Sequence, residues 1–148
     1  MKDKLIFLSP KSREDFEKYF LFRWKMLREP WSQKQGSEID KFEEEAFHIM
    51  GVSSTKNIFA VGRLHMINKH IAQIRYMAVL EQYKKLGYGT QVLKLLENYA
   101  LNNQISKVVL NSRESAINFY IKNGYKKIKQ VDRLFGQINH WFMEKEIN

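Results

Sequence analysis

The chain has 148 residues, the size of one domain, so we expect a single domain over residues 1–148 and exclude a multidomain protein. Hydrophobic residues make up 44% and charged residues 28%, which is a globular composition, and the lack of cysteine excludes disulfides, thiolate metal sites and cysteine nucleophiles. The 25 basic and 16 acidic residues give a net charge of +9, which favours an anionic partner: nucleic acid, an acidic membrane or a phosphorylated small molecule.

The N-terminal segment predicts a strand and a helix. The apolar run before Pro10 is too short for a signal-peptide core, and no later run approaches the roughly 18 apolar residues that cross a membrane, so we expect a cytoplasmic protein. Residues 5–8 predict a short strand. Ser12 then serves as the N-cap of a helix whose apolar side chains follow helical spacing and which ends before Pro30.

The middle of the chain predicts strands followed by a helix. Residues 29–43 show no clear period and predict a loop, with a short helix over 39–45. The apolar, β-branched and aromatic stretches that follow predict three strands joined as hairpins, over 47–53, 58–67 and 71–79. From Gly87 the apolar residues change to helical spacing, as far as Ala100.

The C-terminal third predicts a strand, a helix and two further strands. Residues 107–110 predict a short buried strand, and Asn111 with Glu114 three residues later resembles a capping box. This box would open a helix that ends at Asn123 and Gly124. Two strands follow, over 125–134 and 138–146. The order of the elements predicts a mixed α/β sheet.

The segment from Arg75 to Thr90 carries the clearest functional signal: a strand, a turn with two glycines and the start of a helix. Unpaired N–H groups and the positive dipole end of a helix bind anions, and glycines let the backbone approach a phosphate closely. Lys84 and Lys85 add positive charge to this turn. The segment therefore predicts an anion-binding turn, with a purely structural tight turn as the alternative.

Two common phosphate-binding motifs do not fit this turn. The nucleotide P-loop requires Gly-Lys followed by Ser or Thr, which the turn lacks. The dinucleotide-binding fingerprint requires a third Gly or Ala where this chain has Val92, and an acidic residue about twenty positions further on, where it has residues 108–111. Both classes of nucleotide site are therefore excluded for this segment.

Several motifs in order along the chain resemble the GNAT superfamily of N-acetyltransferases. They are Met77-Ala78-Val79, Lys84-x-x-Gly87-x-Gly89, Val108-x-Leu110-Asn111 and Ala116-x-x-Phe119-Tyr120-x-x-Asn123-Gly124-Tyr125. Lys84 departs from the Arg or Gln that begins the family's glycine motif, but it keeps a donor and a positive charge. Residues 22–30, 45–48 and 138–143 extend the likeness and resemble the ElaA-like members of the superfamily.

The resemblance implies both a fold and an activity. The fold is a GNAT-like α/β domain with a mixed, mostly antiparallel sheet of about six or seven strands and helices on both faces. The activity is transfer of an acetyl group from acetyl-CoA, the co-substrate, to the primary amine of a small molecule or peptide, by direct attack on the thioester. Neither nucleic acid nor a membrane is an expected partner.

The resemblance also implies which residues bind acetyl-CoA. The end of a strand lends backbone groups to the pantetheine arm, and the glycine turn binds the pyrophosphate. The residues at these places are Met77, Ala78, Val79, Lys84, Lys85, Leu86, Gly87, Tyr88, Gly89 and Thr90, joined by Asn111 and Asn118. A role as a helix cap stays an equal alternative for Asn111.

Tyr120 matches the general acid of the superfamily. The ordinary pKa of a tyrosine lies above that of a thiol, so full proton donation to the leaving thiolate is uphill by about 2 kcal/mol. Tyr120 is therefore expected to act mainly as a hydrogen-bond donor to sulfur, with plain aromatic packing as the alternative reading.

The general base is less clearly marked than the acid. Gln73 stands where histone-type members carry a glutamate, and an amide takes no proton. His48 and His140 are the candidate bases that titrate near neutral pH, with packing or hydrogen bonding as the alternative role for each. Otherwise water relays the proton from elsewhere, or the amine arrives already neutral. The four histidines show no metal-ligand spacing, so no metal site is predicted.

Two other classes of protein stay open at this point. Gln73 is compatible with a non-catalytic CoA-binding sensor, and the net charge alone is compatible with a basic nucleic-acid-binding domain. Arg23 either pairs with an acid or holds a substrate carboxylate, whereas Arg75 is predicted to be structural. The acceptor amine and the oligomeric state, for which a homodimer is one option, are not defined by the sequence.

Overall fold

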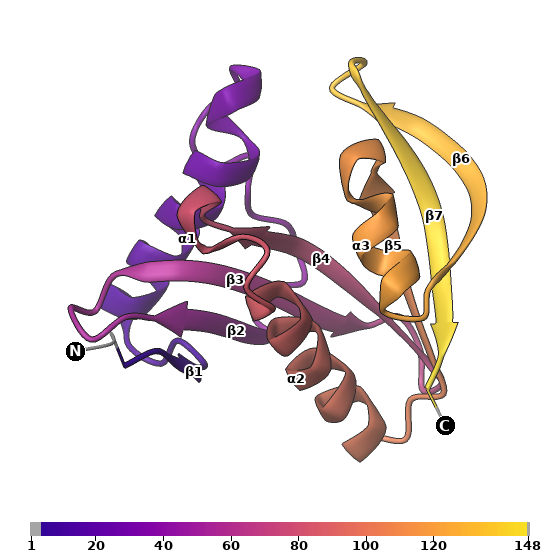
Figure 1. Cartoon of the computed structure of the whole chain (residues 1–148), viewed down its shortest axis with the longest axis horizontal. Coiled ribbons are helices and arrows are strands. Elements are labelled where there is room, and N and C mark those ends of the chain that lie inside the picture. Colours follow the sequence, from indigo (N-terminus) through magenta and orange to yellow (C-terminus); the bar gives the residue numbers. More distant parts are fainter. Residues whose placement is uncertain (1–3, 148) are drawn as a thin grey trace.

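A computed structural model describes residues 4–147 and follows the predicted order of strands and helices (Figure 1). The strands are β1 (Ile6–Leu8), β2 (Phe47–Val52), β3 (Ile58–Met66), β4 (Ile71–Val79), β5 (Lys107–Arg113), β6 (Lys126–Leu134) and β7 (Ile138–Glu146). The helices are α1 (Arg13–Leu27), α2 (Tyr88–Asn102) and α3 (Ile117–Lys122), with short 3-10 turns at Glu29–Trp31, Glu81–Tyr83 and Glu114–Ala116.

The strands form one sheet in the order β1-β2-β3-β4-β5-β7-β6. Every neighbouring pair is antiparallel except β4 and β5, which are parallel, so the predicted mixed and mostly antiparallel sheet is confirmed. The parallel pairing is short, since residues 71–73 of β4 pair with residues 107–109 of β5. Beyond this point the two strands diverge, and the sheet opens between them (Figure 1).

A β-bulge in β4 marks the start of this opening. Val61 of β3 lies opposite Ala78 and Arg63 lies opposite Arg75, so two residues of β4, Tyr76 and Met77, share one partner position. Tyr76 has φ of 63°, in the left-handed region that aromatic residues rarely occupy. The bulge turns β4 away from regular pairing and leaves its C-terminal end free to line the opening.

The helices cover both faces of the sheet, as predicted. Ala60 and Val61 are neighbours on β3 and therefore point to opposite faces. Ala60 belongs to the core cluster that contains residues of α2 and α3, whereas Val61 belongs to the cluster that contains Tyr19 of α1. α2 lies so close to β3 that a Cβ atom added at Gly62 would stand 2.6 Å from Cγ1 of Val92.

Two local predictions are wrong, the capping box at Asn111 and the short helix over residues 39–45. The predicted capping box of Asn111 and Glu114 does not form, because β5 continues through Arg113 in register with β7 and α3 begins only at Ile117. Cross-strand pairing therefore outweighs the capping preference of asparagine at this position. The predicted helix over residues 39–45 is a series of turns, in which the Asp40 carboxylate accepts a hydrogen bond from the N–H of Phe42.

Candidate active site

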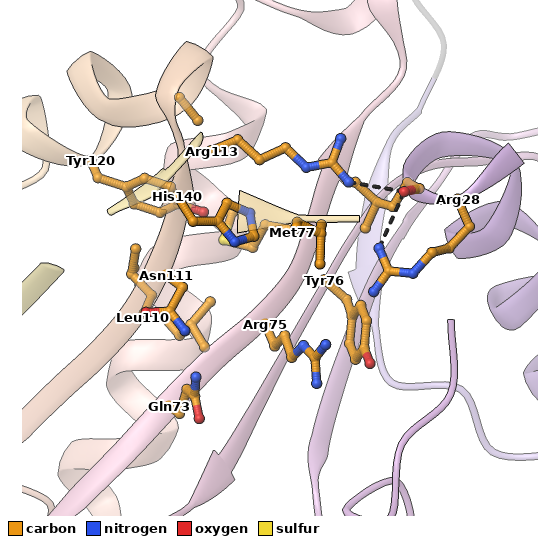
Figure 2. A pocket seen from close by; sticks show the side chains of 14 residues that line it. Arg28, Gln73, Arg75, Tyr76, Met77, Leu110, Asn111, Arg113, Tyr120 and His140 are labelled. Carbon is orange, nitrogen blue, oxygen red and sulfur yellow. Dashed lines mark hydrogen bonds between the residues drawn. The ribbon is translucent and has the colours of Figure 1, made fainter. Parts of the chain in front are cut away.

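The opening between β4 and β5 contains a cavity of about 360 Å³, a volume that suits a small molecule. Its walls come from β4, β5 and α3 and from the end of α1, so it reaches from one face of the sheet to the other (Figure 2). The polar residues in its walls are Arg28, Gln73, Arg75, Asn111, Arg113 and His140. Met77 and Tyr120 line it as well.

Tyr120 extends from α3 into this cavity (Figure 2). Its ring packs edge to face against Phe119 and Tyr125, with centroids 5.0 and 5.7 Å away. Among residues 4–147 no group forms a hydrogen bond with its hydroxyl. Burial raises the pKa of Tyr120 above its ordinary value, so the hydroxyl stays protonated at neutral pH and is available as a donor.

The glycine turn lies where β4 leads into α2. Lys85 and Gly87 have φ of 64° and 89°, and this left-handed backbone turns the chain into the helix. The first backbone hydrogen bond of α2 runs from the N–H of Gln91 to the carbonyl of Gly87, at 3.1 Å. The N–H groups of residues 88–90 precede this bond and have no partner within the helix, an arrangement that suits an anion.

The glycine turn adjoins the ends of both β4 and α3. A Cβ atom added at Gly89 would lie 3.1 Å from the Phe119 ring and 3.8 Å from Cγ2 of Val79. Asn118 is exposed and precedes Phe119 on α3. The structure thus gathers the N-terminal ends of α2 and α3 at the end of β4.

The predicted site residues fall into two groups, apart from Ala78 and Val79 at the end of β4 and Asn118 on α3. Met77, Asn111 and Tyr120 line the cavity. The turn from Lys84 to Thr90 stands outside its walls, at the start of α2, with Lys84 in an exposed ion pair with Glu81 at 3.1 Å. A ligand that bridges both groups must be elongated, with an anionic end at the turn.

The two histidines considered as bases have different surroundings. His48 is buried, and both ring nitrogens are engaged: Nδ1 lies 2.9 Å from the Tyr19 hydroxyl and Nε2 lies 2.7 Å from the Glu43 carbonyl. His140 lines the cavity together with Gln73. Burial, followed by the positive charges of Arg113, Arg75 and Arg28, lowers the pKa of His140, so its ring is neutral at pH 7.

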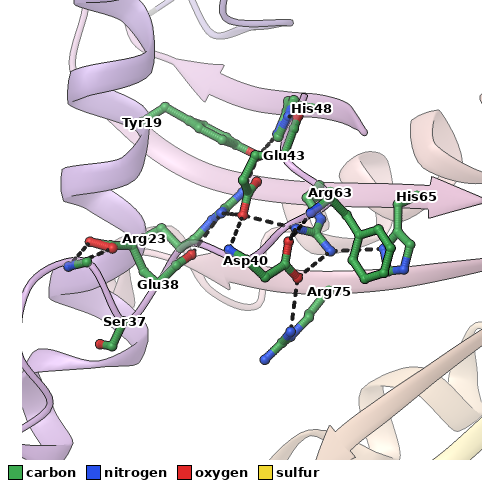
Figure 3. A network of polar contacts seen from close by, with 12 residues as sticks. Tyr19, Arg23, Ser37, Glu38, Asp40, Glu43, His48, Arg63, His65 and Arg75 are labelled. Carbon is green, nitrogen blue, oxygen red and sulfur yellow. Dashed lines mark hydrogen bonds and ion pairs between the residues drawn. The ribbon is translucent and has the colours of Figure 1, made fainter. Parts of the chain in front are cut away.

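A polar network supports the bulge of β4 from the α1 side (Figure 3). Arg23 is fully buried and pairs with Glu43 at 2.9 Å, which identifies it as a structural residue. Arg63 pairs with Asp40 and Glu43, and Arg75 pairs with Asp40 at 3.0 Å. The guanidinium carbons of Arg23, Arg63 and Arg75 lie 4.1 to 4.9 Å from the centre of the Tyr76 ring.

Histidine 65 makes the stability of this network depend on pH. Its buried ring stacks on Phe42, and Nη2 of Arg63 lies 2.9 Å from its Nδ1. Burial and the charge of Arg63 lower the pKa of His65 to about 4. In the unfolded chain the pKa of His65 is about 6.5, so below this pH the unfolded chain binds a proton at His65 that the folded protein does not bind. The free energy of unfolding therefore falls by up to about 3 kcal/mol as the pH drops from about 6.5 to 4.

His65→Gln is therefore expected to flatten the dependence of the free energy of unfolding on pH between about 6.5 and 4. Urea unfolding of both proteins at several pH values measures this difference. His70→Gln, at an exposed histidine, is the matched control. An unchanged pH dependence in the His65 variant would remove the ring from this role.

Two residues in the cavity walls, Arg28 and Arg113, were not singled out from the sequence. Both guanidinium groups donate to the carbonyl of Leu27 at the end of α1, at 3.2 and 2.9 Å (Figure 2). The sequence shows only that Arg28 follows a predicted helix and that Arg113 lies just beyond a predicted strand. Their convergence depends on how α1 meets β5, which no local pattern describes.

Comparison with known proteins gives the family. The model of the acetyltransferase (GNAT) family matches residues 13–125. An uncharacterized N-acetyltransferase of Bacillus subtilis, YjcF, is 28% identical over 92% of this chain and 96% of its own length. The fold is similar to that of a GNAT acetyltransferase from Elizabethkingia anophelis with acetyl-CoA bound (TM-score 0.74, 15% identity, 98% of this chain and 99% of that one). It is also similar to Escherichia coli ElaA (TM-score 0.73, 17% identity, 98% of this chain and all of that one).

The split sheet, the glycine turn at the start of α2 and the family match agree on one class of protein, the acyl-group transferases that use a coenzyme A thioester. This chain belongs to the GNAT family of acetyltransferases.

Proposed function

We propose that the protein transfers the acetyl group of acetyl-CoA to the primary amine of a small molecule, by direct attack of the amine on the thioester carbonyl. The observation that carries this proposal is the position of Tyr120. Its protonated hydroxyl faces a cavity in the sheet opening, next to a helix N-terminus suited to a pyrophosphate. The cavity volume supports a small acceptor.

The proposed cofactor site uses the two groups of residues described above. The turn from Lys84 to Thr90 would hold the pyrophosphate, through backbone N–H groups and lysine charges. The backbone of Met77, in the bulge, and of Ala78 and Val79 beyond it would contact the pantetheine arm. Asn111 in the cavity wall and Asn118, an exposed residue of α3, complete the proposed set. The elongated shape of acetyl-CoA fits a path from the turn into the sheet opening.

The chemistry proposed for the cavity needs a donor near the sulfur and an acceptor for the proton of the amine. Burial raises the pKa of Tyr120, which makes full proton donation still less favourable and supports its role as a hydrogen-bond donor to the leaving sulfur. His140 is neutral and lines the same cavity, so it is the proposed proton acceptor. Gln73, in the same walls, can position a water molecule but takes no proton.

Calorimetric titration of the protein with acetyl-CoA, CoA and ATP at moderate salt tests this function. Selective binding of acetyl-CoA and CoA is the expected result, followed by thiol release when amines are added. Equal binding of the three ligands would indicate a generic phosphate site and contradict the proposal. Binding of CoA without thiol release from a broad amine set would favour a sensor.

The branch, the location and the assembly belong to the proposal too. Placement near the ElaA-like members rests on the N-terminal and C-terminal motifs, since the fold is shared with many acetyltransferases. No helix within residues 4–147 is long and apolar enough to cross a membrane. A cytoplasmic location, a single domain over 1–148 and the option of a homodimer stay predictions.

A further inference from the structure

The charges in the cavity walls are unbalanced. Three arginines and His140 line the cavity, and none of its described lining residues is Asp or Glu. Arg75 is compensated by Asp40, 3.0 Å away. Arg28 and Arg113 have no carboxylate within 4.0 Å among residues 4–147. The cavity therefore presents two cationic side chains that the protein itself does not neutralise.

These two arginines are held in place but keep donors unused. Arg28 is only 4% exposed and donates to the carbonyls of Leu27 and Ser37, each at 3.2 Å. The Arg113 side chain is half-buried and makes one hydrogen bond to residues 4–147, from Nη2 to the carbonyl of Leu27. A guanidinium has five N–H donors, so Arg113 keeps most of them for a ligand. Burial lowers the pKa of Arg113, and the positive charge of Arg28 lowers it further.

A structural explanation accounts for only part of this arrangement. The carbonyl of Leu27 ends α1, and cations at a helix C-terminus stabilise the negative end of its dipole. Arg28 also lies over the rings of Tyr76 and Phe135, 5.5 and 5.1 Å from their centres. Arg28 thereby has favourable contacts, although no carboxylate within residues 4–147 balances its charge. Arg113 comes from β5, on the other side of the opening, and has no ring contact of this kind among the described residues.

The phosphates of the cofactor do not explain these charges. In the proposed function the pyrophosphate lies at the start of α2, on the face of the sheet that α2 and α3 cover. Arg28 and Arg113 meet at the end of α1, which covers the opposite face. Figure 2 shows Tyr120 at one end of the cavity and the two guanidinium groups at the other. An anion bound between them therefore belongs to the acceptor.

We infer that the acceptor is a small amine that also carries an anionic group, a carboxylate or phosphate, which Arg113 and Arg28 bind at the α1 end of the cavity. A guanidinium fork matches either anion with paired hydrogen bonds. With its anion held there, the acceptor would direct its amine along the cavity toward Tyr120 and the thioester. This inference rests on the proposed function and narrows its substrate class, against neutral amines and polyamines.

The test compares amines that differ only in the distant group. 4-Aminobutanoate, 3-aminopropylphosphonate, 4-aminobutanol and 1,4-diaminobutane are titrated into CoA-saturated protein by calorimetry and assayed for thiol release with acetyl-CoA. Tighter binding and a higher kcat/KM for the anionic amines are expected. Comparison of 4-aminobutanoate with 3-aminopropylphosphonate shows whether the site prefers a carboxylate or a phosphate-like group. Equal or better use of the alcohol or the diamine would overturn the inference.

Variants assign the preference to the arginines. Arg113→Gln is expected to reduce the ratio of kcat/KM for the anionic amine over the alcohol at least tenfold, and Arg113→Lys to retain part of that ratio. Arg13→Gln removes the same charge from an exposed residue of α1 and is the matched control. A ratio unchanged in both Arg113 variants would also overturn the inference.

The failure of this inference is distinct from the failure of the proposed function. If the protein binds acetyl-CoA and acetylates neutral amines as well as anionic ones, only the proposed acceptor class is refuted. A protein that does not bind acetyl-CoA refutes the acetyltransferase proposal itself, and the acceptor class falls with it.

Discussion

Tyr120→Phe is expected to lower kcat about a hundredfold while leaving the affinity for acetyl-CoA within about twofold. The substitution removes only the hydroxyl, and the ring can keep its packing against Phe119 and Tyr125. The hydroxyl has no hydrogen-bond partner to lose among residues 4–147, so the fold should not suffer. Steady-state kinetics of thiol release and calorimetric titration of acetyl-CoA measure the two quantities separately.

The control for this experiment is Tyr125→Phe. The Tyr125 hydroxyl donates to Glu97 at 2.8 Å in the buried core and is not in the cavity walls. Its removal should lower the free energy of unfolding by about 1–3 kcal/mol without a specific loss of kcat. An unchanged kcat in the Tyr120 variant would exclude this residue from the reaction, and a parallel loss of kcat in both would indicate a general effect on the fold.

Gly89→Glu is expected to abolish measurable binding of acetyl-CoA. A carboxylate placed in the first turn of α2 would meet the pyrophosphate at the same N–H groups. Two like charges about 4 Å apart repel by roughly 4 kcal/mol near a protein surface, or about a thousandfold in affinity. The added side chain also presses on Phe119, since its Cβ would lie 3.1 Å from that ring.

Gly89→Gln separates charge from bulk. It has the same shape without the charge, so it should lose affinity through crowding alone and bind acetyl-CoA more tightly than the Glu variant. Acidic residues favour the first turn of a helix, so the Glu variant should not unfold, which thermal denaturation can verify. Full affinity in the Glu variant would show that the turn does not bind the cofactor.

The order of the elements followed from the sequence because its signals are local. Ser12 caps α1 and Asp15 returns a capping hydrogen bond, as short-range chemistry dictates. Gly87 begins α2 with a left-handed backbone, where glycine is the favoured residue. Asn111 shows the limit of such reasoning, since its pairing with Phe142 on a distant strand decides its conformation.

The candidate site was predictable where motifs mark it and not where the fold assembles it. Met77 and Tyr120 belong to contiguous motifs, and both line the cavity. Arg113 and Leu27 are 86 positions apart, and their hydrogen bond exists only because α1 ends beside β5. Asp40 likewise meets Arg63 and Arg75 through the path of a loop without a regular period. The acceptor end of the cavity is therefore the part that only the structure reveals.

The short parallel pairing of β4 and β5 also means that side-chain packing, more than strand pairing, joins the two halves of the sheet. Within residues 4–147, the ladder between residues 71–73 and 107–109 is the only strand pairing that joins them. Glu97 of α2 accepts hydrogen bonds from Tyr125 and Lys145 of the C-terminal half, at 2.8 and 2.9 Å. Tyr120, Arg113 and the bulge at Tyr76 lie toward the open end, so the packing of helices across the opening holds the spacing of these groups.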